Sequence, residues 1–150
     1  MKKTILFFTL IFASFFVAGT ATAQVKVSIN IGSQPVWGPQ GYDHADYYYL
    51  PDIDAYYNVA QRKYIYMDGG KWIFATALPS RFSNFDLYKS YKVVVNQPKP
   101  YLHTAQYRKQ YAQYKGRHDQ PVIRDSHDQK YFQIKDHPEH SKWKGKDGHH

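Results

Sequence analysis

Apolar and polar residues alternate strictly near the start of the chain, in "QVKVSINIG". Val25, Val27, Ile29 and Ile31 fall on one side of an extended chain, and lysine, serine and asparagine fall on the other. A period of two residues is typical of a half-buried strand, so the pattern predicts a strand over residues 24–32. The segment "SQPVWGPQG" that follows is rich in proline and glycine and predicts a loop.

Four later segments also predict strands because they are short and rich in aromatic and β-branched residues: "DAYYNV", "KYIYMD", "KWIFATAL" and "YKVVVNQ". The "DGG" between the second and third predicts a tight hairpin, since glycine accepts a positive φ. The sheet is expected to stop at "QPKP", because proline has no N–H to donate to a neighbouring strand.

Two segments favour helix. "LPSRFSNFDLY" predicts a turn and a short helix, with Ser83 as its N-cap. "YLHTAQYRKQYAQY" places Tyr107, Tyr111 and Tyr114 at helical spacing, which predicts a C-terminal helix. The expected fold class is therefore α+β: a small antiparallel β-meander with one short helix and a C-terminal helix, followed by a disordered tail.

Composition divides the chain into three parts. Residues 1–23 have the features of a signal peptide: two lysines, the apolar stretch Ile5–Gly19 and a small-residue "ATA" before Gln24. The apolar run is short for a retained membrane helix. Residues 24–115 form the predicted tyrosine-rich, β-rich domain. Residues 116–150 are rich in histidine and lysine and poor in apolar residues, so their burial cannot offset the entropy of ordering and they are expected to be disordered.

Charge and cysteine content indicate how an exported domain would be stabilised and which partners it would meet. The chain has no cysteine, so an exported domain must be stabilised by burial without disulfides. Its formal net charge is +8. After export to the periplasm or the outside of the cell, with no transmembrane segment left, a basic protein meets envelope glycans, anionic surfaces or protein partners rather than nucleic acid.

The 15 tyrosines allow two readings. An aromatic platform would stack sugar rings or other planar ligands, with Trp37, Tyr48 and Tyr57 as the candidate ligand-binding residues. Alternatively, most rings form the core, because a small leucine-poor sheet must bury aromatic residues. We expect the second reading for most of them. The run Tyr47–Tyr49 is the hardest to explain as core, because adjacent strand residues face opposite sides.

The tail histidines raise a second possibility. His118, His127, His137 and His140 are candidate ligands for Cu²⁺, Ni²⁺ or Zn²⁺. The alternative is a soluble segment that gains charge as the pH falls. Upstream, "DHAD" and "DID" lack the spacing of known metal loops, and no cofactor is predicted.

Taken in order, "YYYLPDIDAYYNVAQRKYIYMDGGKWIFATALP" and "YKVVVNQPKPYLH" resemble a pattern in short exported bacterial proteins of unknown function. Their shared features are a tyrosine triplet before Leu-Pro, a "YY" strand, a "Y-x-Y" strand, a "G-x-W" hairpin, a closing "LP" and a tail rich in histidine and lysine. The resemblance implies an envelope or secreted location and a small β-rich domain, and it supplies no catalytic residue.

Nothing in the sequence indicates an enzyme. The chain has no cysteine nucleophile, no G-x-S-x-G, no H-E-x-x-H and no phosphate-binding glycine loop. The leading hypothesis is a non-catalytic envelope protein that contacts proteins or glycans through its β-rich domain. The alternative is a metal-binding or metal-buffering protein that acts through the histidine-rich tail.

Overall fold

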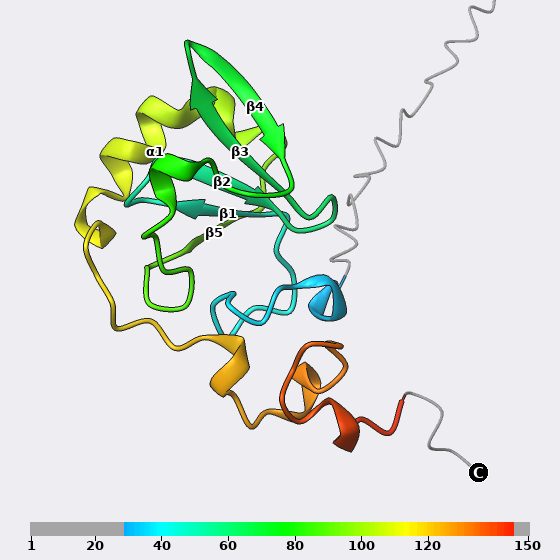
Figure 1. Cartoon of the computed structure of the whole chain (residues 1–150). Helices are drawn as coiled ribbons and strands as arrows, with labels where there is room; N and C mark the ends of the chain where they lie inside the picture. Colours follow the sequence, from blue (N-terminus) through cyan, green and yellow to red (C-terminus); the bar gives the residue numbers. More distant parts are fainter. Residues whose placement is uncertain (1–28, 146–150) are drawn as a thin grey trace, which may run out of the picture.

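A five-stranded antiparallel sheet is the centre of the computed structural model, which describes residues 29–145 (Figure 1). The strand order is β4-β3-β2-β1-β5. The strands are β1 (Tyr47–Leu50), β2 (Ala55–Asn58), β3 (Lys63–Asp68), β4 (Lys71–Ala75) and β5 (Val93–Val95). One short α-helix, α1 (Thr104–Gln110), is present among the described residues. The α+β class and the antiparallel sheet are confirmed.

The strand predictions from residue 54 onward are confirmed, because β2, β3, β4 and β5 lie within the four predicted segments. The β3–β4 hairpin closes over Gly69 and Gly70, whose φ angles are 54° and 75°. Both values lie in the left-handed region, so Asp68 and Lys71 face each other across a two-residue turn.

The predicted strand at residues 24–32 is wrong where the structure describes it. Residues 31–33 form a 3₁₀ turn, and residues 24–28 lie outside the described part of the chain. The side chain of Asn30 accounts for the difference. Its Oδ1 accepts from the N–H of Ala45 at 2.9 Å, and its Nδ2 donates to the Ala45 carbonyl at 2.7 Å. These bonds fasten the segment to the loop before β1, so it turns instead of joining the sheet.

The helical predictions are longer than the helices that form. The short helix expected within residues 78–88 is a single 3₁₀ turn, Ser80–Phe82. Within residues 101–114 only the seven residues of α1 are α-helical, and 3₁₀ turns flank them on both sides. A helix of this length is not stable alone. It is therefore held by packing of Tyr107 and Tyr111 on the sheet.

Tyrosines fill both faces of the sheet, starting from the unpredicted strand β1. Successive residues of β1 point to opposite faces, so Tyr48 and Tyr49 belong to different core clusters. On one face Tyr49 packs under α1, in a cluster completed by Tyr56, Ile65, Val95 and Tyr107. On the other face Tyr48 packs in a cluster that includes Trp37, Tyr57, Tyr64 and Tyr66. Half-buried residues of the 78–88 segment complete this second layer.

The predicted disorder of residues 116–150 is wrong for residues 116–145, and residues 146–150 lie outside the described part. Ile123, Tyr131 and Ile134 are buried in a third cluster together with Ile31. The Ile123 N–H donates to the Gly38 carbonyl at 2.8 Å, and the Arg124 N–H donates to the Val36 carbonyl at 2.7 Å. The few apolar residues of this segment are sufficient to order it because they share a core with Ile31, at the beginning of the domain.

Removal of this segment is therefore expected to destabilise the whole domain. Ile123→Ala should lower the free energy of unfolding by about 2–4 kcal/mol, because the side chain is fully buried. Truncation after Gly116 should lower the melting temperature measured by circular dichroism. The matched control is Ile29→Ala, at a side chain that is 70% exposed, which should change stability by less than about 0.5 kcal/mol. An unchanged melting temperature after truncation would contradict this packing.

The tyrosine core is expected to make the fold sensitive to alkali. Burial raises the pKa of Tyr48 and Tyr49 well above the ordinary 10, and it raises the pKa of Tyr56 and Tyr64 to about 12. Above pH 10 the unfolded chain therefore loses these protons while the folded chain keeps them. These tyrosines leave the free energy of unfolding unchanged below pH 10. Above pH 10 the free energy of unfolding falls by up to about 1.4 kcal/mol per pH unit for each such tyrosine.

The measurement is denaturant unfolding at a series of pH values between 9 and 12. Tyr64→Phe, which removes one of these ionising groups, should make the loss of stability with pH less steep. The explanation fails if tyrosinate absorbance shows the core rings ionising near pH 10 while the fold stays intact.

Candidate functional site

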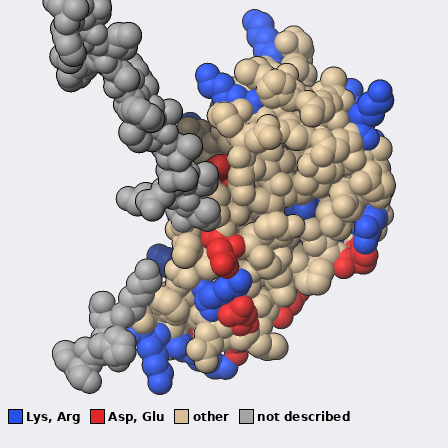
Figure 2. Space-filling model, turned by 180° about the vertical axis from the view of Figure 1, so that it is seen from behind, with Lys and Arg blue, Asp and Glu red and all other residues tan. Residues whose placement is uncertain are grey.

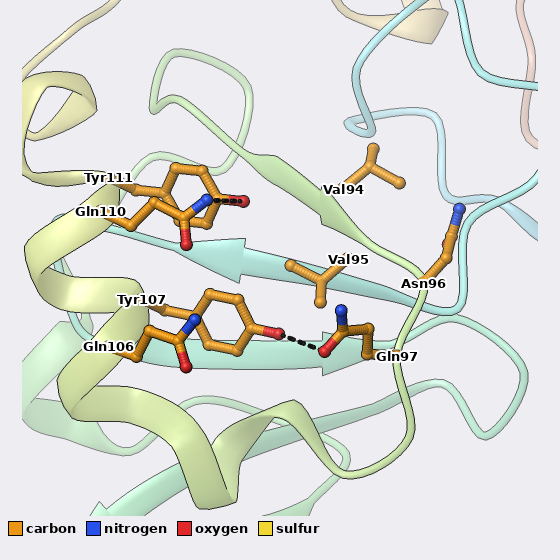
Figure 3. A pocket seen from close by; sticks show the side chains of 8 residues that line it. All are labelled: Val94, Val95, Asn96, Gln97, Gln106, Tyr107, Gln110 and Tyr111. Atoms are coloured by element: carbon orange, nitrogen blue, oxygen red, sulfur yellow. Dashed lines mark hydrogen bonds between the residues drawn. The ribbon is translucent and has the colours of Figure 1, made fainter.

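A groove of about 400 Å³ lies between β5 and α1 (Figure 3). No side chain in its lining is charged. Four of the lining residues carry side-chain amides, and the others are two valines and two tyrosines. The lining residues are Val94, Val95, Asn96, Gln97, Gln106, Tyr107, Gln110 and Tyr111. The groove therefore offers neutral hydrogen-bond donors and acceptors beside apolar surface.

Helical spacing explains the wall that α1 provides. Tyr107 and Tyr111 lie four residues apart, and their rings stack with centroids 5.8 Å apart. Gln106 and Gln110 precede them by one position and are exposed on the rim. The hydroxyl of Tyr107 donates to Oε1 of Gln97 at 3.2 Å, which ties the helix to the segment after β5 (Figure 3).

The opposite wall is formed by the main chain of β5. The side chain of Val94 packs on the face of the sheet away from α1 and points away from the helix in Figure 3. The side chain of Val95 belongs to the face under α1. What Val94 presents to the groove is therefore its backbone.

Strand register shows which backbone groups of β5 face outward. The two-residue turn makes Asp68 and Lys71 a hydrogen-bonded pair. Hydrogen-bonded pairs alternate along antiparallel strands. Within each strand, residues that bond to one neighbouring strand therefore alternate with residues that bond to the other. Starting from Asp68 and Lys71, this rule makes the hydrogen-bonded pairs of the other strands Ile65–Tyr56, Tyr57–Tyr48, Tyr49–Val93 and Tyr47–Val95. The N–H and C=O of Val94 must then point away from β1, to the side where the described chain has no further strand.

A glutamine side chain already occupies the preceding outward position. Nε2 of Gln120 donates to the Lys92 carbonyl at 2.9 Å, and the Lys92 N–H donates to Oε1 of Gln120 at 2.8 Å. A primary amide has the donor and acceptor of a peptide group, so Gln120 stands in for a neighbouring strand. Val94 is the next outward residue, two positions further along the edge.

Lys92 itself was not identified from the sequence, because a lysine beside a strand is usually exposed. Its side chain is only 1% exposed, and Nζ donates to the Leu87 carbonyl at 2.7 Å. Burial lowers the pKa of this amine to about 8, against the opposing effect of Asp86. The side chain is closed off from solvent, so its function is to hold the 87–92 loop against the start of β5.

The residues named for the aromatic platform are buried. Trp37 is 9%, Tyr48 0% and Tyr57 7% exposed. The rings of Trp37 and Tyr57 meet edge to face at 4.8 Å, and the hydroxyl of Tyr48 donates to Oε1 of Gln34 at 2.9 Å. These three residues pack in the core, so they offer no accessible ring face on which a sugar could stack.

The four predicted metal ligands are also dispersed. His137 is buried between the carbonyl of Ile123 and the N–H of Glu139, 3.1 Å from each, so both ring nitrogens have partners. His118, His127 and His140 contact the Lys89 carbonyl, the Glu139 carboxylate and the Phe132 carbonyl, respectively. Residues 29–145 contain no group of three or more His, Cys, Asp or Glu that could hold a metal ion. The structure does not bring these histidines together as a metal site.

Comparisons with models of protein families, with curated proteins and with solved structures gave no match. Within residues 29–145, no helix has the length and apolar character to cross a membrane. The groove is therefore interpreted from its own geometry.

The inferred direction of the Val94 backbone gives a testable asymmetry in stability. Val94→Pro removes an N–H that faces the groove, whereas Val95→Pro removes one that bonds to β1. Val95→Pro should therefore lower the free energy of unfolding by about 1–3 kcal/mol more than Val94→Pro. Val94→Ala and Val95→Ala measure the loss of each side chain, and denaturant unfolding of all four variants gives the difference. The register would be contradicted if Val94→Pro and Val95→Pro, each compared with the alanine variant at the same position, lowered the free energy of unfolding equally.

Proposed function

We propose that this chain is an exported, non-catalytic binding protein that holds an extended segment of a partner polypeptide in the groove between β5 and α1. The observation that carries the proposal is the outward N–H and C=O of Val94, facing a groove lined by side-chain amides. An extended peptide that pairs with a sheet edge uses these main-chain groups, and neighbouring side chains then select its sequence.

The chemistry of the lining favours a peptide over the other envelope partners. Since none of the lining side chains is charged, the groove has no group that would pair with a phosphate or a carboxylate. A glycan is favoured where an aromatic ring presents a free face, but Tyr107 is buried against the sheet. The volume, about 400 Å³, suits a few residues of an extended chain.

Export is part of the proposal and is supported by the sequence of residues 1–23. In the periplasm or outside the cell, the partner would be another exported protein with an accessible extended segment. The groove provides positioning and hydrogen bonds, and its lining contains no serine, threonine, cysteine, histidine, lysine, aspartate or glutamate.

The proposal is tested by selecting binders from a library of short random peptides displayed on phage, with residues 24–150 as the target. A selected peptide is then titrated calorimetrically against the same protein and its variants. Val94→Pro should weaken binding about tenfold, the equivalent of one main-chain hydrogen bond. Gln106→Ala combined with Gln110→Ala should weaken it further.

The matched control is Gln113→Ala, at an exposed amide outside the groove, which should leave the affinity unchanged. Hydrogen exchange adds an independent readout, because a paired strand should slow the exchange of amides lining the groove. Selected peptides that bind Val94→Pro as tightly as the unmodified protein, or a failure to select any peptide, would refute the proposal.

A further inference from the structure

A second exposed surface lies at the opposite end of the sheet, beside β4. Met67, Phe74 and Leu102 are 43%, 46% and 61% exposed, although all three are large apolar side chains. Tyr101 joins them, because its ring centroid lies 5.6 Å from Trp72 and 5.3 Å from Phe74. We call the five residues Met67, Trp72, Phe74, Tyr101 and Leu102 the Tyr101 surface.

The short helix explains why this surface is left uncovered. Tyr107 and Tyr111 of α1 contact Tyr49, and Tyr107 also contacts Tyr56, so the helix lies over β1 and β2. β4 is the far edge of the same sheet, and the β3–β4 hairpin projects beyond the helix (Figure 1). The 3₁₀ turn Pro100–His103 reaches β4 through the ring of Tyr101, which contacts Trp72 and Phe74. The apolar face that α1 buries therefore continues onto the outside of the molecule.

The charges around the Tyr101 surface have one sign. Residues 63–67, 71–76 and 98–103, which form it, contain no aspartate or glutamate. They contain four exposed basic residues: Lys63, Lys99 and His103, together with Lys71, which lies opposite Asp68 in the hairpin and therefore points to the other face of the sheet. In the view from behind, uncharged residues cover most of the upper part of the molecule, and lysines and arginines stand at its margin (Figure 2).

The nearest acidic side chain in the hairpin, Asp68, adds no negative charge to the Tyr101 surface. Asp68 lies at the turn, and its carboxylate is paired with Arg81 at 2.9 Å. Position 68 lies on the same side of β3 as Tyr66, which packs on the other face of the sheet. The Tyr101 surface is thus apolar at its centre and cationic at its rim.

We propose that the Tyr101 surface docks the protein on an anionic lipid surface. Tryptophan and tyrosine favour the boundary between headgroups and hydrocarbon, and exposed leucine, phenylalanine and methionine gain by leaving water there. Lysines around such a patch are attracted to negatively charged headgroups. An envelope polysaccharide fits less well, because Phe74, Leu102 and Met67 offer no hydrogen bonds to sugar hydroxyls. This site is separate from the groove, which lies at the β5 edge.

The test is sedimentation with vesicles, using residues 24–150, because the apolar stretch Ile5–Gly19 would enter lipid by itself. One set of vesicles contains phosphatidylcholine alone, and the other contains phosphatidylcholine mixed with phosphatidylglycerol. The apparent dissociation constant should be at least about tenfold lower for the anionic vesicles, and binding to them should weaken as salt is raised. No sedimentation, or equal binding to both vesicle types, would overturn the proposal.

Variants locate the contact. Phe74→Ser combined with Leu102→Ser should weaken binding at least about tenfold, and Lys99→Glu should weaken it in low salt. The matched controls are Ile29→Ser and Lys135→Glu, at exposed residues outside the Tyr101 surface, which should bind as the unmodified protein does. Circular dichroism establishes that each variant is folded. Equal losses in the control and surface variants would place binding elsewhere and overturn the proposal.

The groove variant Val94→Pro separates the two proposals. It should reduce peptide binding and leave vesicle binding unchanged, because Val94 and the Tyr101 surface lie at opposite edges of the sheet. A loss of vesicle binding in Val94→Pro would mean that lipid meets the β5 edge, and this also would overturn the assignment to the Tyr101 surface.

Discussion

Burial of tyrosine rings on both faces of one sheet is the constraint on which the rest of the structure depends. A buried ring contributes apolar area, but its hydroxyl still requires a hydrogen-bond partner. The hydroxyl of Tyr49 donates to Asp54 at 2.7 Å, and that of Tyr56 lies 3.0 Å from the hydroxyl of Thr104. Asp54 in turn pairs with Arg108 of α1 at 2.9 Å. The hydroxyls under the helix therefore fix where the helix lies.

The same constraint connects the opposite face to the C-terminal segment. A Cβ on Gly38 would lie 2.7 Å from the hydroxyl of Tyr48 and 3.0 Å from the Pro35 carbonyl, so only glycine fits beside that ring. The carbonyl of Gly38 is then free to accept from the Ile123 N–H. The hydroxyl of Tyr131 accepts from the Gly41 N–H at 2.7 Å. A loop shaped by Tyr48 thus becomes the docking site for residues 121–131.

The sequence predicts what local patterns control. β3 and β4 are short segments rich in aromatic and β-branched residues on either side of a glycine turn, and that turn fixes where they meet. β1 was missed because a strand buried on both faces has no contrast between apolar and polar positions, and "YYYL" shows none. The C-terminal segment was assigned to disorder because its entropy was weighed only against its own side chains. Ile31, which completes its core, lies more than 90 residues away in the chain.

The groove was equally hidden, because no motif marks it. It exists because β5 returns to pair with β1, which brings residues 94–97 beside residues 106–111. Sequence alone shows the valines, the glutamines and the tyrosine stripe, but not the pairing of β5 with β1. The candidate platform was misplaced for a related reason: its residues were chosen for their aromatic character, whereas their burial depends on the loop and the 78–88 segment that cover the face of the sheet away from α1.

The length of α1 determines the character of both sheet edges. Edge strands carry unpaired main-chain groups and must be protected or used. At β5, only three residues long, Gln120 protects one outward position, and the amides of α1 keep the adjoining space polar. At β4 the helix is absent, so the same alternation leaves the backbone of Trp72 and Phe74 outward beside uncovered apolar side chains. A polar edge suits a peptide that arrives from water, whereas an apolar edge with a cationic rim suits the boundary of a lipid layer. One sheet covered by a helix too short for it therefore presents two different surfaces.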